Sequence, residues 1–376
     1  MKRKKIVVFG LVILIVATMV AFFCFFRHRK ESDILWASNW QGARWFNENG
    51  AFEVDGDLLY YYNPQSLKRI VACGKAGCRH EGKGCPAYGG DMCGITFTST
   101  GLMYFSSISG RLDMYGLYRI DSDGTNLREL HRFRDVDMVG VGGGIEYDGN
   151  QIWFSYNRIV DDDGKDLVEP ESGIIGYNLV NGKEKRVFKE RKVASHISAL
   201  AHCGSEVYFI YRYSDMTRAE ALEHAEDQDY ADGKEHFVLA AVSEGGGNYR
   251  IISEKIFSAT CLSVAGDVVY FCREDGVYAC DAKTKEVSQV KKGAFEMIPA
   301  YRDGEQELLL RDMDSAAEQK SYWHWNEGAF HKISGGGEVC LSVNGDYAWF
   351  MDEEGTWMIA DAEDFLSGKK LACRSF

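Results

Sequence analysis

Three cysteines and one histidine form the most distinctive chemical motif in this chain of 376 residues. They share one short loop with the spacing Cys-x4-Cys-x-His-x4-Cys, and they are Cys73, Cys78, His80 and Cys85. Three thiolates and an imidazole match a closed structural zinc site, in which four protein ligands surround a tetrahedral ion and leave no open position. The spacing therefore predicts a structural zinc ion as the one expected cofactor, and it does not predict a catalytic metal.

A further cysteine allows a different chemistry for the same loop. Cys93 follows Cys85 in the chain, and outside the membrane four neighbouring cysteines can form disulfides with three alternative pairings. His80 would have no role in a disulfide loop. The sequence leaves both chemistries open, and in each of them the loop, residues 73–93, is a structural staple with no catalytic residue.

The elements that must position this loop repeat along the chain. In one copy Gly345, flanked by Asn344 and Asp346, is followed by a short strand that contains Trp349 and Phe350. Related turn glycines are Gly56, Gly101, Gly149, Gly204, Gly266 and Gly304. Glycine beside Asn or Asp supplies the positive backbone angles of a hairpin turn. A repeat of about forty to about sixty residues is typical of propellers and solenoids.

A slim residue precedes each turn glycine by five positions. These residues are Ala51, Thr96, Gly144, Ala199, Cys261, Pro299 and Cys340. In a propeller the innermost strands converge on a crowded axis, whereas a β-sandwich has no reason to repeat a small residue there. The pattern predicts an all-β fold, a β-propeller of seven four-stranded blades. Six or eight blades would also fit, because the first and sixth copies are irregular.

The amino terminus predicts attachment to a membrane. Residues 1–5 carry four Lys or Arg, residues 6–26 are uncharged, and residues 27–30 are basic again. An apolar run of roughly 20 residues can cross a bilayer as a helix, and no clean cleavage pattern follows it. We expect a cytoplasmic tail over 1–5, a transmembrane signal anchor over 6–26, a juxtamembrane segment with first-blade strands over 27–50, and the propeller over 51–376.

Charge bears on location and on partners. The Lys/Arg bias across the anchor is slight, and a five-residue tail is easily left inside, so we expect a single-pass protein with its propeller on the extracytoplasmic side of the cell membrane. Residues 1–30 hold seven of the 43 basic residues and no acidic residue, which leaves a net charge of −20 on the rest. Such a surface repels polyanions, so nucleic acid is excluded as a partner.

Several stretches resemble a known group of proteins. They are residues 59–64 (Leu-Tyr-Tyr-Tyr-Asn-Pro), the Cys/His loop with its Cys85-Pro86-Ala87-Tyr88 run, and the hairpin at 123–127 (Asp-Gly-Thr-Asn-Leu). The chain resembles uncharacterised, membrane-attached, exported β-propeller proteins of Gram-positive bacteria, and the hairpin is similar to those of TolB-like propeller repeats. The resemblance implies the fold and membrane attachment, and it implies no activity. Many members are lipoproteins, whereas Phe23 before Cys24 departs from a lipidation signal.

Two loops carry further candidate residues. Residues 214–236 form an insertion in which Thr217 and Glu220 predict a helix with a capping box. Its side chains Glu220, Glu223, His224 and Asp227 could supply ligands or an acid/base pair, although a solvated helix explains them better. The acidic run at 161–166 could bind calcium, but a solvated turn explains it better.

These features favour a binding protein over an enzyme. The chain contains no phosphate-binding loop, dinucleotide fingerprint, Gly-x-Ser-x-Gly or His-Glu-x-x-His motif. We expect a membrane-tethered binding or assembly module whose peptide, glycan or protein ligand sits on the propeller face near the insertion. The alternative is a carbohydrate-active or other hydrolytic enzyme that uses loop carboxylates, and a cluster of carboxylates with a histidine at the axial mouth would favour it.

Overall fold

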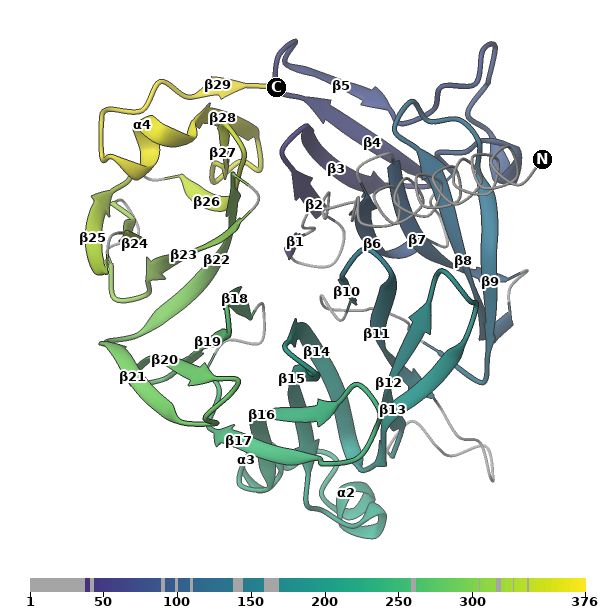
Figure 1. Ribbon diagram of the computed structural model, residues 1–376, viewed down its shortest axis with the longest axis vertical. Coiled ribbons are helices and arrows are strands. Elements are labelled where there is room, and N and C mark those ends of the chain that lie inside the picture. Colours follow the sequence, from purple (N-terminus) through teal and green to yellow (C-terminus); the bar gives the residue numbers. More distant parts are fainter. Residues whose placement is uncertain are drawn as a thin grey trace, which may run out of the picture.

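The fold is a ring of antiparallel sheets (Figure 1). The computed structural model describes residues 38–40, 44–88, 92–98, 101–108, 111–137, 145–158, 169–257, 262–303, 305–315, 319–326, 328–336 and 338–376. The first sheet contains β1 (Ser38–Trp40), β2 (Arg44–Asn47), β3 (Gly50–Asp55), β4 (Leu58–Asn63) and β5 (Lys68–Val71). The second contains β6 (Met92–Thr98), β7 (Gly101–Ile108), β8 (Arg111–Asp121) and β9 (Arg128–Arg134). Each strand pairs with the next one along the chain.

Three further sheets repeat this order. The third contains β10 (Ile145–Tyr147), β11 (Gln151–Arg158), β12 (Glu171–Asn178) and β13 (Glu184–Arg191). The fourth contains β14 (Val193–Cys203), β15 (Glu206–Ser214), β16 (Glu235–Ser243) and β17 (Arg250–Glu254). The fifth contains β18 (Ser263–Ala265), β19 (Val268–Arg273), β20 (Gly276–Asp281) and β21 (Val287–Lys292).

The last sheet has eight strands in two halves. One half contains β22 (Phe295–Arg302), β23 (Glu305–Asp312), β24 (Ser321–Asn326) and β25 (Ala329–Ser334). The other contains β26 (Val339–Asn344), β27 (Tyr347–Met351), β28 (Trp357–Asp361) and β29 (Arg374–Ser375), with α4 (Ala362–Leu366) between its last two strands. The halves join where β22 and β26 run parallel, with Ala300 opposite Val343. The predicted all-β propeller fold is therefore confirmed.

The slim residues lie where the repeat predicts them in four of the sheets. Thr96, Ala199, Pro299 and Cys340 lie on β6, β14, β22 and β26, the first strands of their sheets. Gly144 and Cys261 lie outside the described residues. These first strands face the centre of the ring in Figure 1, and Cys340 is fully buried.

The first sheet departs from the prediction by one strand. Ala51 lies on β3, but β2 is the strand that packs against β6 and β26 and lies nearer the centre of the ring (Figure 1). The pattern points to β3 because the hairpin between β3 and β4, and not the one between β2 and β3, turns at a glycine, Gly56, with a φ of 59°. Tyr60 and Tyr61 then follow this turn as the aromatic pair does elsewhere, so sequence alone could not separate the two hairpins.

The predicted membrane anchor lies outside the described residues. Residues 1–37 lie outside the described part of the chain, and so does the acidic run at 161–166. In the ranges that the structure describes, no helix has both the length and the apolar character needed to span a bilayer.

The insertion lies away from the centre of the ring. It forms two short helices, α2 (Arg218–Glu223) and α3 (Gln228–Asp232), and the predicted capping box between Thr217 and Glu220 is present. Glu220 also accepts a hydrogen bond from Tyr230 Oη at 3.3 Å, and the His224 ring stacks on Tyr230 with centroids 3.8 Å apart. Figure 1 shows both helices at the perimeter of the ring. Glu220, His224 and Asp227 therefore stabilise the insertion, and a ligand at the ring centre would not contact its helices.

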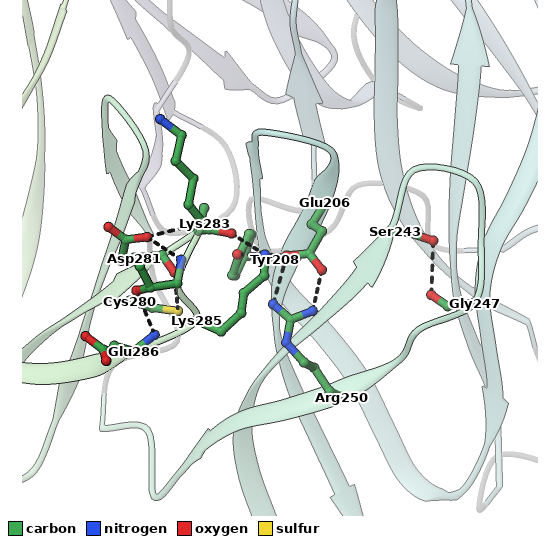
Figure 2. Close-up of polar contacts among 12 residues, drawn as sticks. Glu206, Tyr208, Ser243, Gly247, Arg250, Cys280, Asp281, Lys283, Lys285 and Glu286 are labelled. Carbon is green, nitrogen blue, oxygen red and sulfur yellow. Dashed lines mark hydrogen bonds and ion pairs between the residues drawn. The ribbon is translucent and has the colours of Figure 1, made fainter.

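A charged network joins the fourth and fifth sheets (Figure 2). Glu206, at the start of β15, is 8% exposed and accepts hydrogen bonds from both terminal nitrogens of Arg250 on β17, Nη2 at 2.8 Å. Lys285, in the turn after β20 of the next sheet, donates to the same carboxylate at 2.6 Å, and Tyr208 donates at 3.0 Å. These donors, the Arg250 hydrogen bond foremost, lower the pKa of Glu206 to about 2.

We predict that Glu206→Gln lowers the free energy of unfolding at pH 7 by about 1–2 kcal/mol, because the substitution removes a charge that three cationic or hydroxyl donors stabilise. The pKa of Glu206 in the folded protein lies below the ordinary value of 4.5. The stabilisation that its charge contributes is therefore present above pH 4.5 and is lost as the pH falls towards 2. Urea unfolding of both proteins across this range measures it.

The matched control is Glu286→Gln, since this side chain is exposed in the same region. The control should unfold with the parent protein at every pH. A difference between parent and Glu206→Gln that stays constant from pH 7 to pH 3 would contradict the assignment of the stabilising charge to Glu206.

Candidate metal centre and adjoining pocket

The Cys/His loop connects β5 to β6 and folds by a series of tight turns. Gly77, His80 and Gly82 all have positive φ, at 68°, 59° and 63° respectively. The main-chain N–H of Cys78 donates to the Lys75 carbonyl at 3.2 Å, and a short 3-10 helix, η1 (Gly82–Gly84), precedes Cys85. A positive φ is uncommon for histidine and costs roughly 1 kcal/mol. The loop tolerates this cost at the residue whose ring joins the thiols.

The structure brings the four predicted ligands together. The ligand atoms of Cys73, Cys78, His80 and Cys85 all lie within 4.8 Å of one another. Cys85 Sγ lies 3.5 Å from His80 Nδ1, which matches the edge of a tetrahedron built on a Zn–S bond of about 2.3 Å and a Zn–N bond of about 2.0 Å. The arrangement has the donor set and the dimensions of a tetrahedral metal site.

The fourth cysteine of the disulfide alternative, Cys93, lies apart from the other three. Among the described residues no disulfide joins Cys73, Cys78 or Cys85. These three side chains belong to the core between the first two sheets, whereas Cys93 packs against the core between the second and third sheets. Cys93 therefore faces away from the other three cysteines.

The thiols differ in their electrostatic surroundings. Burial raises the pKa of Cys85 to about 11, while the main-chain N–H of His80 is the first cause of a lowered pKa at Cys78. A metal binds thiolates, so occupation of the site must release protons from at least the buried thiol.

Main-chain contacts fix the loop to both neighbouring sheets. Leu59 on β4 donates to Ala87 at 2.8 Å and accepts from Ala72 at 2.9 Å. On the other side, Gly74 N–H donates to the Gly124 carbonyl in the β8–β9 turn at 3.1 Å. A Cβ at Gly74 would collide with the Asp123 carbonyl oxygen, and only glycine permits this approach. The loop is therefore a bridge between the first and second sheets.

A pocket of about 360 Å³ opens beside this bridge. Its floor is aromatic, because the Phe52 ring lies 5.0 Å from Tyr61 and 5.1 Å from Phe97 between centroids. The remaining lining residues are Asn47, Asn49, Ile70, Val71, Ala72, Cys73, Thr98, Gly101, Leu102, Ile120, Asp121, Ser122, Asp123 and Gly124. Cys73 belongs both to the pocket wall and to the Cys/His cluster.

A second, polar pocket of about 430 Å³ gathers carboxylates from three turns. Glu48, Asp303 and Asp346 line it, together with the hydroxyl-bearing rings of Tyr61 and Tyr347. Among the described residues that line it there is no histidine. Three carboxylates from separate turns therefore face one polar pocket.

Sequence reasoning missed the apolar pocket. It placed a ligand on the propeller face near the insertion, whereas the pocket lies between two sheets next to the Cys/His loop. One signal was available, since Ile70 and Val71 are consecutive apolar residues on an outer strand. Side chains alternate along a strand, so one of the two had to point away from the core, and Ile70 is 48% exposed.

Comparisons with known proteins show the fold. No family model and no curated protein matches the chain. A prolyl endopeptidase structure has a TM-score of 0.55 at 11% identity and covers 92% of this chain. TolB from Acinetobacter baumannii has a TM-score of 0.39 at 12% identity, covering 81% of this chain and 63% of its own. The WD40 domain of SCAP from fission yeast has a TM-score of 0.44 at 12% identity, covering 91% and 87%. The chain spans 50% of the prolyl endopeptidase chain, and the likeness shows that the fold is that of a β-propeller.

Proposed function

We propose that the protein is a membrane-tethered, extracytoplasmic binding module, a seven-bladed propeller that holds its ligand between the first and second sheets. The observation that carries the proposal is the apolar pocket beside the Cys/His loop. Its volume lies within the roughly 300–1,000 Å³ of ligand pockets, and its apolar floor with a few polar groups at the rim is typical of them.

The chemistry of the pocket supports binding over catalysis. Asp121 accepts a hydrogen bond from Asn126 at 2.8 Å, and Asp123 accepts from both the N–H and the hydroxyl of Thr125. These carboxylates are engaged in shaping a turn. In the described part of the lining there is no histidine or lysine to act as a base, and the thiol of Cys73 belongs to the Cys/His cluster.

We also propose that zinc occupies the Cys/His cluster and holds one wall of the pocket in place. Two observations support zinc over disulfides, namely the imidazole among the thiols and the separation of Cys93 from the other three cysteines. A closed site with four protein ligands has a structural role, and its binding free energy contributes to folding.

The purified full-length chain should contain about one zinc ion per molecule by elemental analysis. We expect Cys85→Ser to lose the metal and to melt several degrees lower. Cys93→Ser is the matched control and should keep both the metal and the melting temperature, because Cys93 lies in a different core. Metal-free protein with no free thiol at Cys73, Cys78 or Cys85 would establish disulfides instead.

Ligand binding can be measured before the ligand is known. A fragment library of aromatic and aliphatic amines, short peptides and sugars, screened by ligand-observed NMR on the full-length chain, should give hits that Ala72→Phe abolishes by filling the pocket. The same substitution on an exposed outer strand, Ala329→Phe, should keep every hit. Hits that survive Ala72→Phe, or the absence of any hit, would overturn the proposed binding function.

A further inference from the structure

The pocket runs along an open strand edge. In the described part of the first sheet, β5 is the last strand and pairs on one side only, with β4. Four consecutive residues at and after the end of this strand, from Ile70 to Cys73, line the pocket. A ligand in the pocket therefore lies beside a strand whose second edge is free.

The free edge offers hydrogen-bonding groups of the main chain. Ala72 N–H donates to Leu59, and Ile70 lies opposite Tyr61 in the same antiparallel register. In an antiparallel pair, the main-chain N–H and C=O groups of every second residue point away from the partner strand. On β5 these residues are Arg69 and Val71. The Val71 carbonyl already accepts from Cys73. Within the described residues, the Arg69 N–H and carbonyl and the Val71 N–H are then available to an added strand.

The half of this edge next to the pocket lacks the charged side chains that commonly protect exposed strands. Charged side chains commonly block an edge against pairing, and β5 begins with Lys68 and Arg69. The Arg69 guanidinium, however, lies over the Tyr60 ring at 3.7 Å and pairs with Asp55, so it turns onto the sheet. The half of β5 next to the pocket presents Ile70.

The negative charge at the pocket rim favours a ligand with a positive charge. Asp121 and Asp123 line one wall, and the described lining residues include no Lys or Arg. The hydrogen bond from Thr125 lowers the pKa of Asp123, so the carboxylate is ionised at neutral pH. With a net charge of −20 outside residues 1–30, a ligand that carries Lys or Arg is favoured.

We infer that the ligand is an extended peptide segment that adds to β5 as a further strand, inserts one large apolar side chain into the pocket and places a Lys or Arg beside Asp121 and Asp123. Strand addition of this kind takes affinity from main-chain hydrogen bonds and specificity from a pocket for alternate side chains. The inference rests on the proposed function and names the ligand class for the same pocket.

The test uses a displayed library of random twelve-residue peptides sorted on the purified full-length chain. We expect enriched peptides to share one Leu, Ile, Phe or Trp with a Lys or Arg within two positions. For a synthetic copy, fluorescence anisotropy should show that Ile70→Asp and Ala72→Phe each weaken binding at least tenfold. N-methylation of the peptide bonds beside the apolar residue should weaken it equally, because it removes main-chain donors.

Two controls separate the contributions. Ile251→Asp changes an equally exposed isoleucine on another outer strand, β17, and should leave the affinity unchanged. Asp123→Asn keeps the oxygen that accepts from Thr125 but removes the charge. It should weaken binding about threefold at low ionic strength, and the difference should vanish in high salt. Unchanged melting temperatures of all variants confirm that they fold.

The outcomes distinguish the peptide ligand class from the binding function itself. Affinity that is insensitive to N-methylation, or to both Ile70→Asp and Ala72→Phe, overturns strand addition. If no peptide is enriched although fragments bind in an Ala72→Phe-sensitive manner, the peptide class is wrong and the binding function stands. If neither fragments nor peptides bind, both are overturned.

Discussion

The fold depends on closure of the ring by aromatic side chains from its two ends. Tyr62 of the first sheet stacks on Trp357 with centroids 4.4 Å apart, and Phe46 lies 5.6 Å from the same indole. Trp349 and Ile359 complete this buried cluster. Each sheet can be apolar on both faces because it packs between two neighbours. Without the closing contact, the first and last sheets would each expose an aromatic face to water.

Hydrophobic clusters pack between neighbouring sheets around the ring, and some of these interfaces carry additional contacts of a different kind. Aromatic packing closes the ring, and a carboxylate with three donors ties the fourth sheet to the fifth. The first and second sheets are joined at one end by the Cys/His loop, through hydrogen bonds to Leu59 and Gly124. The apolar pocket lies between these two sheets, beside this main-chain bridge and the hydrophobic cluster that also joins them.

The sequence predicted most of the architecture and the composition of the cluster, but not the position of the pocket. Turn glycines and small residues such as Cys340 are required by local geometry, and their repetition makes the pattern recognisable in the sequence. The donor set of Cys73, Cys78, His80 and Cys85 could be recognised from the sequence because all four residues lie within one loop. The pocket joins Phe52 and Tyr61 to Phe97 across two sheets, and no spacing rule relates these residues. The same limit explains Ala51, since a glycine turn does not show which hairpin of a sheet it closes.

Cys73 connects the two parts of the site physically. Its side chain belongs to the cluster and its residue forms the pocket wall, one position before the glycine that touches the β8–β9 turn. The main chain next to Cys73 is tightly packed against the β8–β9 turn, because a Cβ at Gly74 or at Gly124 would strike the opposing main chain. A displacement of the Cys73 main chain would therefore move the pocket wall. A tightly bound metal would keep that wall in place, at no entropic cost when an added strand arrives.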